Sequence, residues 1–89
     1  MVRNQVIFSG RVQGVGFRHA TKMQARSFSV CGFVRNLRDG TVELVIEGER
    51  EELASFIAAI EERMVGLIKD TNTTTGVVSG EFSKFSVLY

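Results

Sequence analysis

The segment from Gly10 to Arg18 combines glycines with an arginine in a way that could bind a tetrahedral anion. It follows an apolar stretch and precedes a helix-forming one. Glycines let the chain bend so that successive backbone N–H groups point inward, and a helix N-terminus behind them adds positive potential. Arg18 adds a planar, permanently charged fork that matches two oxygens of a phosphate.

The loop fits neither of the common nucleotide-binding motifs. A Walker A loop needs Gly-Lys-Ser/Thr after its spacer, and this segment has no lysine. A dinucleotide fingerprint needs a third glycine three residues after Gly16, where the chain has His19. Taken alone, the loop leaves another interpretation open, in which it is a plain strand-to-helix turn and Arg18 is solvated.

Two motifs together make the chain similar to the acylphosphatase family. The first runs from Val12 to Arg18, and the second runs from Gly32 to Asn36 and continues with Asp39 to Glu43. The resemblance extends to Gly80-Glu81-Phe82 and to the aromatic end from Phe85 to Tyr89. Two separate motifs at matching spacing are more specific than a lone Gly-x-Gly.

The resemblance implies a reaction and the residues that carry it out. Acylphosphatases hydrolyse the carboxyl–phosphate anhydride of small acyl phosphates to a carboxylate and inorganic phosphate. Arg18 matches the family's phosphate-binding arginine, and Asn36 matches the asparagine that positions the attacking water. The phosphate cradle is matched by the backbone N–H groups of Val15, Gly16, Phe17 and Arg18. We expect inorganic phosphate or sulfate to inhibit.

This chemistry calls for neither a metal nor a cofactor. Phosphoryl transfer depends on positioning and charge stabilisation more than on a strong protein base. A carboxylate leaves with little protonation, and an amide can orient water without titrating. The chain has one histidine, one cysteine and no pair at metal-binding spacing. We therefore expect no cofactor and no metal.

Four residues near the motifs also have simpler interpretations. From its position beside a hairpin, Asn36 could be a turn residue that hydrogen-bonds its own backbone, although the two motifs favour the water-orienting role. Gln13 is expected to brace the loop, and His19 to be solvated with no catalytic role. Cys31 is expected to be a small buried residue on a strand.

Length and composition predict one domain spanning residues 1–89. The chain has 89 residues, 44% of them hydrophobic, and a formal net charge of +1. Such a chain can bury one modest core. The near-neutral charge argues against electrostatic binding to nucleic acid or to a membrane. Without a signal peptide or an apolar span, a cytoplasmic protein is expected. We also expect a monomer.

Periodicity predicts the elements that must position the two motifs. Strands are expected at residues 5–8, 31–36, 41–47 and 82–89, and helices at 18–28 and 49–64. Asp39-Gly40 predicts a hairpin. The second helix has an apolar stripe, and the strand at 41–47 places Glu43 and Glu47 on the face opposite its aliphatic residues. The threonine-rich segment 68–75 is expected to be a short edge strand.

This order predicts an α+β fold with the ferredoxin-like two-layer arrangement. The expected topology is βαββαβ with a short extra C-terminal strand, in a mostly antiparallel sheet with two helices on one face. The chain departs from the family in having Ser29 where a glycine usually ends the first helix. A left-handed Ser29 would cost about 1 kcal/mol. The chain also has no proline, and therefore lacks the Gly-Pro usual after the second helix.

Two other functions remain open on the sequence alone. A noncatalytic phosphate-binding or interaction domain on the same fold would keep Arg18 and the loop but would not need Asn36. An RNA-binding module on the same topology would stack bases on an exposed aromatic residue such as Phe33. The clustered aromatic motif and the basic surroundings of such modules are absent.

Overall fold

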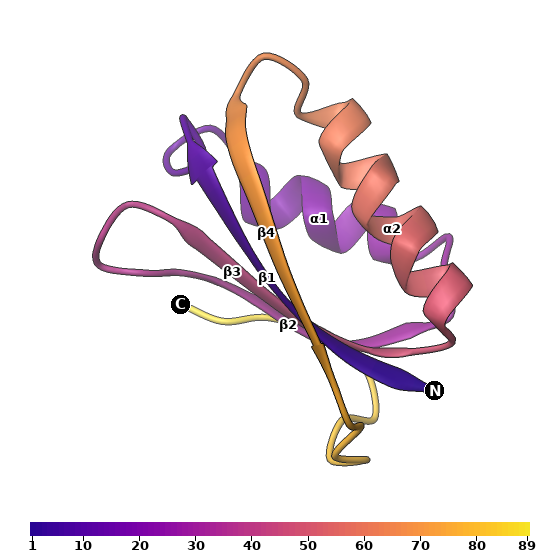
Figure 1. The fold of residues 1–89 in the computed structure, drawn as a ribbon. Coiled ribbons are helices and arrows are strands. Elements are labelled where there is room, and N and C mark those ends of the chain that lie inside the picture. The colour runs from indigo at the N-terminus through magenta and orange to yellow at the C-terminus, as the bar shows by residue number, and fades with distance from the viewer.

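The computed structural model describes residues 1–89, in which two helices cover one face of a five-stranded sheet (Figure 1). The elements are β1 (Val2–Gly10), α1 (Phe17–Ala25), β2 (Val30–Asn36), β3 (Val42–Gly48), α2 (Arg50–Arg63), β4 (Ile68–Gly76) and β5 (Phe85–Val87). The expected α+β, ferredoxin-like arrangement is therefore confirmed. Neither helix is long and apolar enough to cross a membrane.

The sheet has the strand order β4-β1-β3-β2-β5. All neighbouring strands are antiparallel except β2 and β5, which run parallel. Leu44 at the centre of β3 pairs with Val6 of β1 on one side and with Val34 of β2 on the other. Because side chains alternate along a strand, this register lines up one apolar row across the three central strands.

The core lies between that apolar row and the two helices. Val42, Leu44 and Ile46 of β3 belong to the core cluster, whereas Glu43 and Glu47 bind polar side chains on the other face, which confirms the alternation expected for this strand. The apolar stripe of α2 is also confirmed, since its buried members are Leu53, Phe56, Ile60 and, just beyond the helix, Met64. The ring of Phe17 at the start of α1 packs at 5.1 Å against Phe8 of β1 and so fixes the helix next to the first motif.

The first helix is shorter than the sequence predicts. It ends at Ala25, and the next three residues form i to i−3 hydrogen bonds, for example from the Ser27 N–H to the Gln24 carbonyl (3.0 Å). Helix propensity alone does not detect such a tightening of the chain. No residue other than glycine has a positive φ, so Ser29 does not carry the expected strain.

The two last strands differ in length from the sequence prediction. β4 lies at the edge, as expected, but it is nine residues long rather than short, because it pairs with β1 along its whole length. The C-terminal strand covers only residues 85–87, since parallel pairing with β2 is limited to Gly32, Phe33 and Val34. Backbone pairing therefore decides both lengths.

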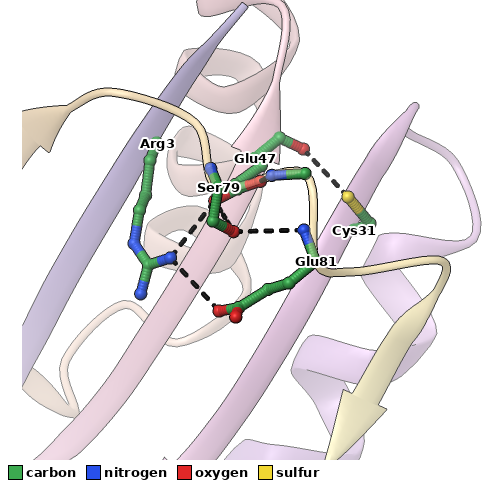
Figure 2. Close-up of polar contacts among 6 residues, drawn as sticks. Arg3, Cys31, Glu47, Ser79 and Glu81 are labelled. Atoms are coloured by element: carbon green, nitrogen blue, oxygen red, sulfur yellow. Dashed lines mark hydrogen bonds and ion pairs between the residues drawn. The ribbon is translucent and has the colours of Figure 1, made fainter.

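The residues after β4 fold over the open face of the sheet and are anchored on Glu47 (Figure 2). The Glu47 carboxylate, only 4% exposed, accepts hydrogen bonds from the Ser79 N–H (2.8 Å), the Ser79 hydroxyl (2.8 Å) and the Gly80 N–H (3.0 Å). It also pairs with Arg3 at 3.2 Å. Burial by itself would raise the pKa of Glu47, but these hydrogen bonds outweigh it and hold the pKa below its usual value.

The single cysteine lies on the same open face. Cys31 is half-buried on β2, and its thiol lies 3.6 Å from the backbone carbonyl of Glu47 (Figure 2). Burial, and then the negative charge of Glu47, raise the pKa of the Cys31 thiol. Both effects favour the protonated thiol. Cys31 lies on a strand, as expected, but it is half-buried rather than buried.

Candidate active site

The first motif forms the loop that joins β1 to α1. Gly14 and Gly16 both have left-handed backbones, with φ of 75° and 78°, and Gly16 is the N-cap of the helix. A Cβ atom added at either position would meet nothing within 4 Å. These glycines are therefore required by the backbone conformation, which costs other residues about 1–2 kcal/mol, and not by lack of space.

Hydrogen bonds hold this loop on two sides. The Arg11 N–H donates to the Leu67 carbonyl (2.8 Å), which ties the loop to the connection between α2 and β4. The Gln13 side-chain amide donates to the carbonyls of Leu37 and Thr41, both at 2.8 Å, which ties it to the hairpin between β2 and β3. The bracing role expected of Gln13 is confirmed, and the brace ends one residue from Asn36.

The two motifs meet in one small pocket at the N-terminus of α1. Its volume is about 170 Å³, and its lining residues are Val12, Gly14, Gly16, Phe17, Arg18, His19, Asn36 and Tyr89. Asn36 comes from the last position of β2, whereas Arg18 lies in the first turn of α1. No aspartate or glutamate side chain lines this pocket, so the arginine and the helix N-terminus make it attractive to an anion.

The C-terminal residues hold the Arg18 side chain. Its Nη1 donates a hydrogen bond to the Leu88 carbonyl (3.1 Å), and its guanidinium carbon lies 4.7 Å from the centroid of the Tyr89 ring. A guanidinium has five N–H donors, so these contacts leave others for a ligand. Sequence reasoning missed Tyr89 as part of the site, because it placed this residue in a strand at 82–89. In the structure this strand ends at Val87.

The hairpin turn next to Asn36 is capped by a different residue. The Asp39 carboxylate accepts hydrogen bonds from the Thr41 hydroxyl (2.6 Å) and the Thr41 N–H (3.0 Å), and these bonds lower the pKa of Asp39. Asp39 therefore fills the turn-stabilising role that the sequence alone left open for Asn36. Asn36 is half-buried, and its side-chain amide makes no hydrogen bond within the protein.

The remaining residues of the first motif differ in how they approach the pocket. Gly16 and Phe17 line it, whereas the Val15 side chain is 36% exposed and borders a neighbouring groove. His19 is exposed, as expected, although it lies at the rim. No group of three or more His, Cys, Asp or Glu side chains is placed to hold a metal ion.

Comparison with known proteins shows that the similarity to acylphosphatases extends along the whole chain. A family model of the acylphosphatases matches residues 4–87. An acylphosphatase of Syntrophotalea carbinolica is 40% identical over 93 residues, which cover 99% of this chain and 97% of that protein. The crystal structure of acylphosphatase from Bacillus subtilis, 34% identical, superposes with a TM-score of 0.91 over 100% of both chains. An acylphosphatase structure from Coxiella burnetii, 32% identical, superposes with a TM-score of 0.84 over 98% of this chain and 92% of that one. The chain belongs to the acylphosphatase family.

Proposed function

We propose that this protein hydrolyses the carboxyl–phosphate anhydride of small acyl phosphates in the pocket that contains Arg18 and Asn36. Membership of the acylphosphatase family and full-length relatives of that name support this activity, which makes the protein a hydrolase of acid anhydrides. The observation that carries the residue assignment is the meeting of an arginine, a helix N-terminus and a free amide in one pocket.

In this proposal the phosphoryl group lies at the N-terminus of α1. The backbone N–H groups of residues 15–18 donate to its oxygens, and the Arg18 guanidinium binds two of them from the side. These donors are preorganised, because the left-handed glycines and the Gln13 brace fix the loop before substrate arrives. The guanidinium charge and the N–H dipoles stabilise the negative charge that spreads over the phosphoryl oxygens in the transition state.

Asn36 orients the attacking water through its side-chain amide. Water oxygen forms a new bond to phosphorus, and the bond between phosphorus and the acyl oxygen breaks with its electron pair going to the carboxylate. The proton released by the water ends on a phosphate oxygen, so the products are a carboxylate and inorganic phosphate. A carboxylate is a good leaving group, so the protein has no need to supply a general acid.

The proposal extends to the organisation of the molecule. In this proposal residues 1–89 act as one domain and as a monomer, and a single chain supplies both Arg18 and Asn36. Inorganic phosphate and sulfate compete with the substrate for the same donors. Ordinary alkyl phosphates are expected to be poor substrates, since an alkoxide leaving group needs a proton or a metal, and neither Arg18 nor Asn36 is an acid near neutral pH.

The test is turnover of benzoyl phosphate by the purified protein and by Arg18→Gln. We expect Arg18→Gln to weaken phosphate inhibition by about 10- to 100-fold and to lower turnover at least as much. Arg11→Gln is the matched control, because Arg11 is exposed in the same loop but does not line the pocket. Phosphate binding without turnover in the wild type would instead indicate a noncatalytic phosphate-binding domain.

A further inference from the structure

A groove of about 500 Å³ lies directly beside the phosphate pocket. The two share Gly16 and His19, whereas Asn36 lines only the phosphate pocket. One wall of the groove is formed by α1, and the other by the connection between α2 and β4. A molecule held at the N-terminus of α1 could therefore extend from one cavity into the other.

Five of the nine residues that line this groove are apolar: Val15 in the loop, Ala20 and Met23 on α1, and Met64 and Leu67 beyond α2. The other four are Gly16, His19, Gln24 and Arg63. Met23 and Val15 are 43% and 36% exposed, whereas Met64 is almost fully buried in the core. Met23 gives the groove a flexible, polarisable surface that can adapt to apolar groups of different shape.

We propose that this groove binds the apolar body of the acyl group, so that the enzyme favours acyl phosphates with an extended aliphatic chain. This inference rests on the proposed function, because it takes the phosphoryl group to lie at the N-terminus of α1. In-line displacement places the attacking water and the leaving carboxylate on opposite sides of phosphorus. With the water held by Asn36, the groove lies on the flank that Asn36 does not line.

The length of the groove sets the size of acyl group that gains from it. Met23 lies seven residues after Gly16, which corresponds to about 10 Å along a helix axis. Side chains on a helix lean toward its N-terminus, which brings the Met23 thioether closer to the phosphate pocket. An acetyl group is too short to reach Met23, whereas an octanoyl chain can cover this distance.

The test compares kcat/KM for acetyl phosphate and octanoyl phosphate in the wild type and in Met23→Gln. We expect Met23→Gln to lower kcat/KM for octanoyl phosphate about tenfold, as a polar group placed against the chain would. The loss should be mainly a higher KM, because the contact is the same in the ground state and in the transition state. The value for acetyl phosphate should change by less than about twofold.

Two further variants separate this role from a general effect on the protein. Met23→Leu keeps an apolar side chain and should retain most of the activity toward octanoyl phosphate. Val65→Gln is the matched control, because Val65 is 81% exposed on the neighbouring connection and does not line the groove. In both variants the ratio of kcat/KM for octanoyl phosphate to kcat/KM for acetyl phosphate should stay near the wild-type value.

The outcomes distinguish the inference from the function on which it rests. If the wild type hydrolyses both substrates and Met23→Gln leaves the ratio of their kcat/KM values unchanged, the acyl group does not bind in the groove and this inference is wrong. If the wild type hydrolyses neither substrate, the proposed function itself is wrong, and the assignment of the groove falls with it.

Discussion

The ring of Tyr89 stacks on the guanidinium of Arg18, with 4.7 Å between the guanidinium carbon and the ring centroid. The adjacent Leu88 carbonyl accepts a hydrogen bond from the same guanidinium. A free arginine side chain has about 2 kcal/mol of rotamer entropy to lose on binding. The C-terminal dipeptide therefore restricts Arg18 before an anion arrives.

We predict that Tyr89→Ala weakens anion binding without unfolding the protein. A cation–π contact at an exposed site is worth about 0.5–1 kcal/mol, so the inhibition constant for phosphate should rise roughly two- to fivefold. Stability should change little, because the Tyr89 side chain is fully exposed. Tyr89→Phe keeps the ring and should bind phosphate as the wild type does. Equal weakening by both variants would show that the ring does not hold Arg18.

We predict that Asn36→Ala lowers kcat by about a hundredfold, by analogy with loss of a positioned donor in the transition state. Phosphate inhibition should change much less, because Asn36 is proposed to hold water rather than the phosphoryl group. Asn72→Ala on the exposed edge strand β4 is the matched control. Equal losses in kcat and in phosphate affinity would make Asn36 an anion ligand or a structural residue.

We predict that Gln13→Ala lowers kcat. Without the Gln13 brace, the distance between the phosphate cradle and Asn36 is no longer fixed. The change removes two hydrogen bonds to the hairpin and should cost about 1–3 kcal/mol of stability. A double-mutant cycle tests the positioning role, because coupled residues are not additive. In the Asn36→Ala background, Gln13→Ala should lower kcat much less than it does in the wild type. Full additivity would mean that Gln13 acts on stability alone.

We predict that Glu47 makes the fold sensitive to acid. Its pKa is lowered in the folded state, so its contribution is complete above the usual glutamate value of about 4.3 and is lost as the pH falls through the folded pKa. Glu47→Gln should lower the free energy of unfolding by about 2 kcal/mol at neutral pH and by clearly less in acid. Urea denaturation at several pH values measures this difference.

Glu81→Gln provides the control for that experiment. Glu81 also pairs with Arg3, at 3.5 Å, but its side chain is 60% exposed, and such pairs contribute little to stability. We expect this variant to stay within about 0.5 kcal/mol of the wild type at every pH. A Glu47→Gln curve parallel to the wild-type curve would show that the anchor on the open face does not depend on the charge of Glu47.

The sequence predicts well those features that depend on nearby residues. The glycine-rich bend of the first motif, the hairpin at Asp39-Gly40 and the buried stripe of α2 all follow from local chemistry and spacing. The motifs also placed Arg18 and Asn36 close enough in the fold to share a pocket. For the turns, the hairpin and the stripe, the signal lies within a few positions of the residues that it describes, whereas the link between Arg18 and Asn36 came from the family resemblance.

Features that depend on distant contacts were missed. Tyr89 meets an arginine 71 positions earlier, and no local pattern indicates this partner. Alternation along β3 placed Glu47 on the open face but gave no sign of its burial, which comes from residues 32 and 33 positions later. The length of β4 was underestimated for a similar reason, because its pairing with β1 overrides its poor apolar alternation.

The long edge strand β4 also affects how these molecules behave next to one another. Its outer backbone is free to pair with a strand of another molecule, which makes an exposed edge a common starting point for aggregation. The strand carries threonines, Asn72, Lys69 and Asp70, whereas a valine-rich sequence would expose a hydrophobic edge. Well-hydrated side chains along this border favour separate molecules over sheets that grow by stacking edge to edge.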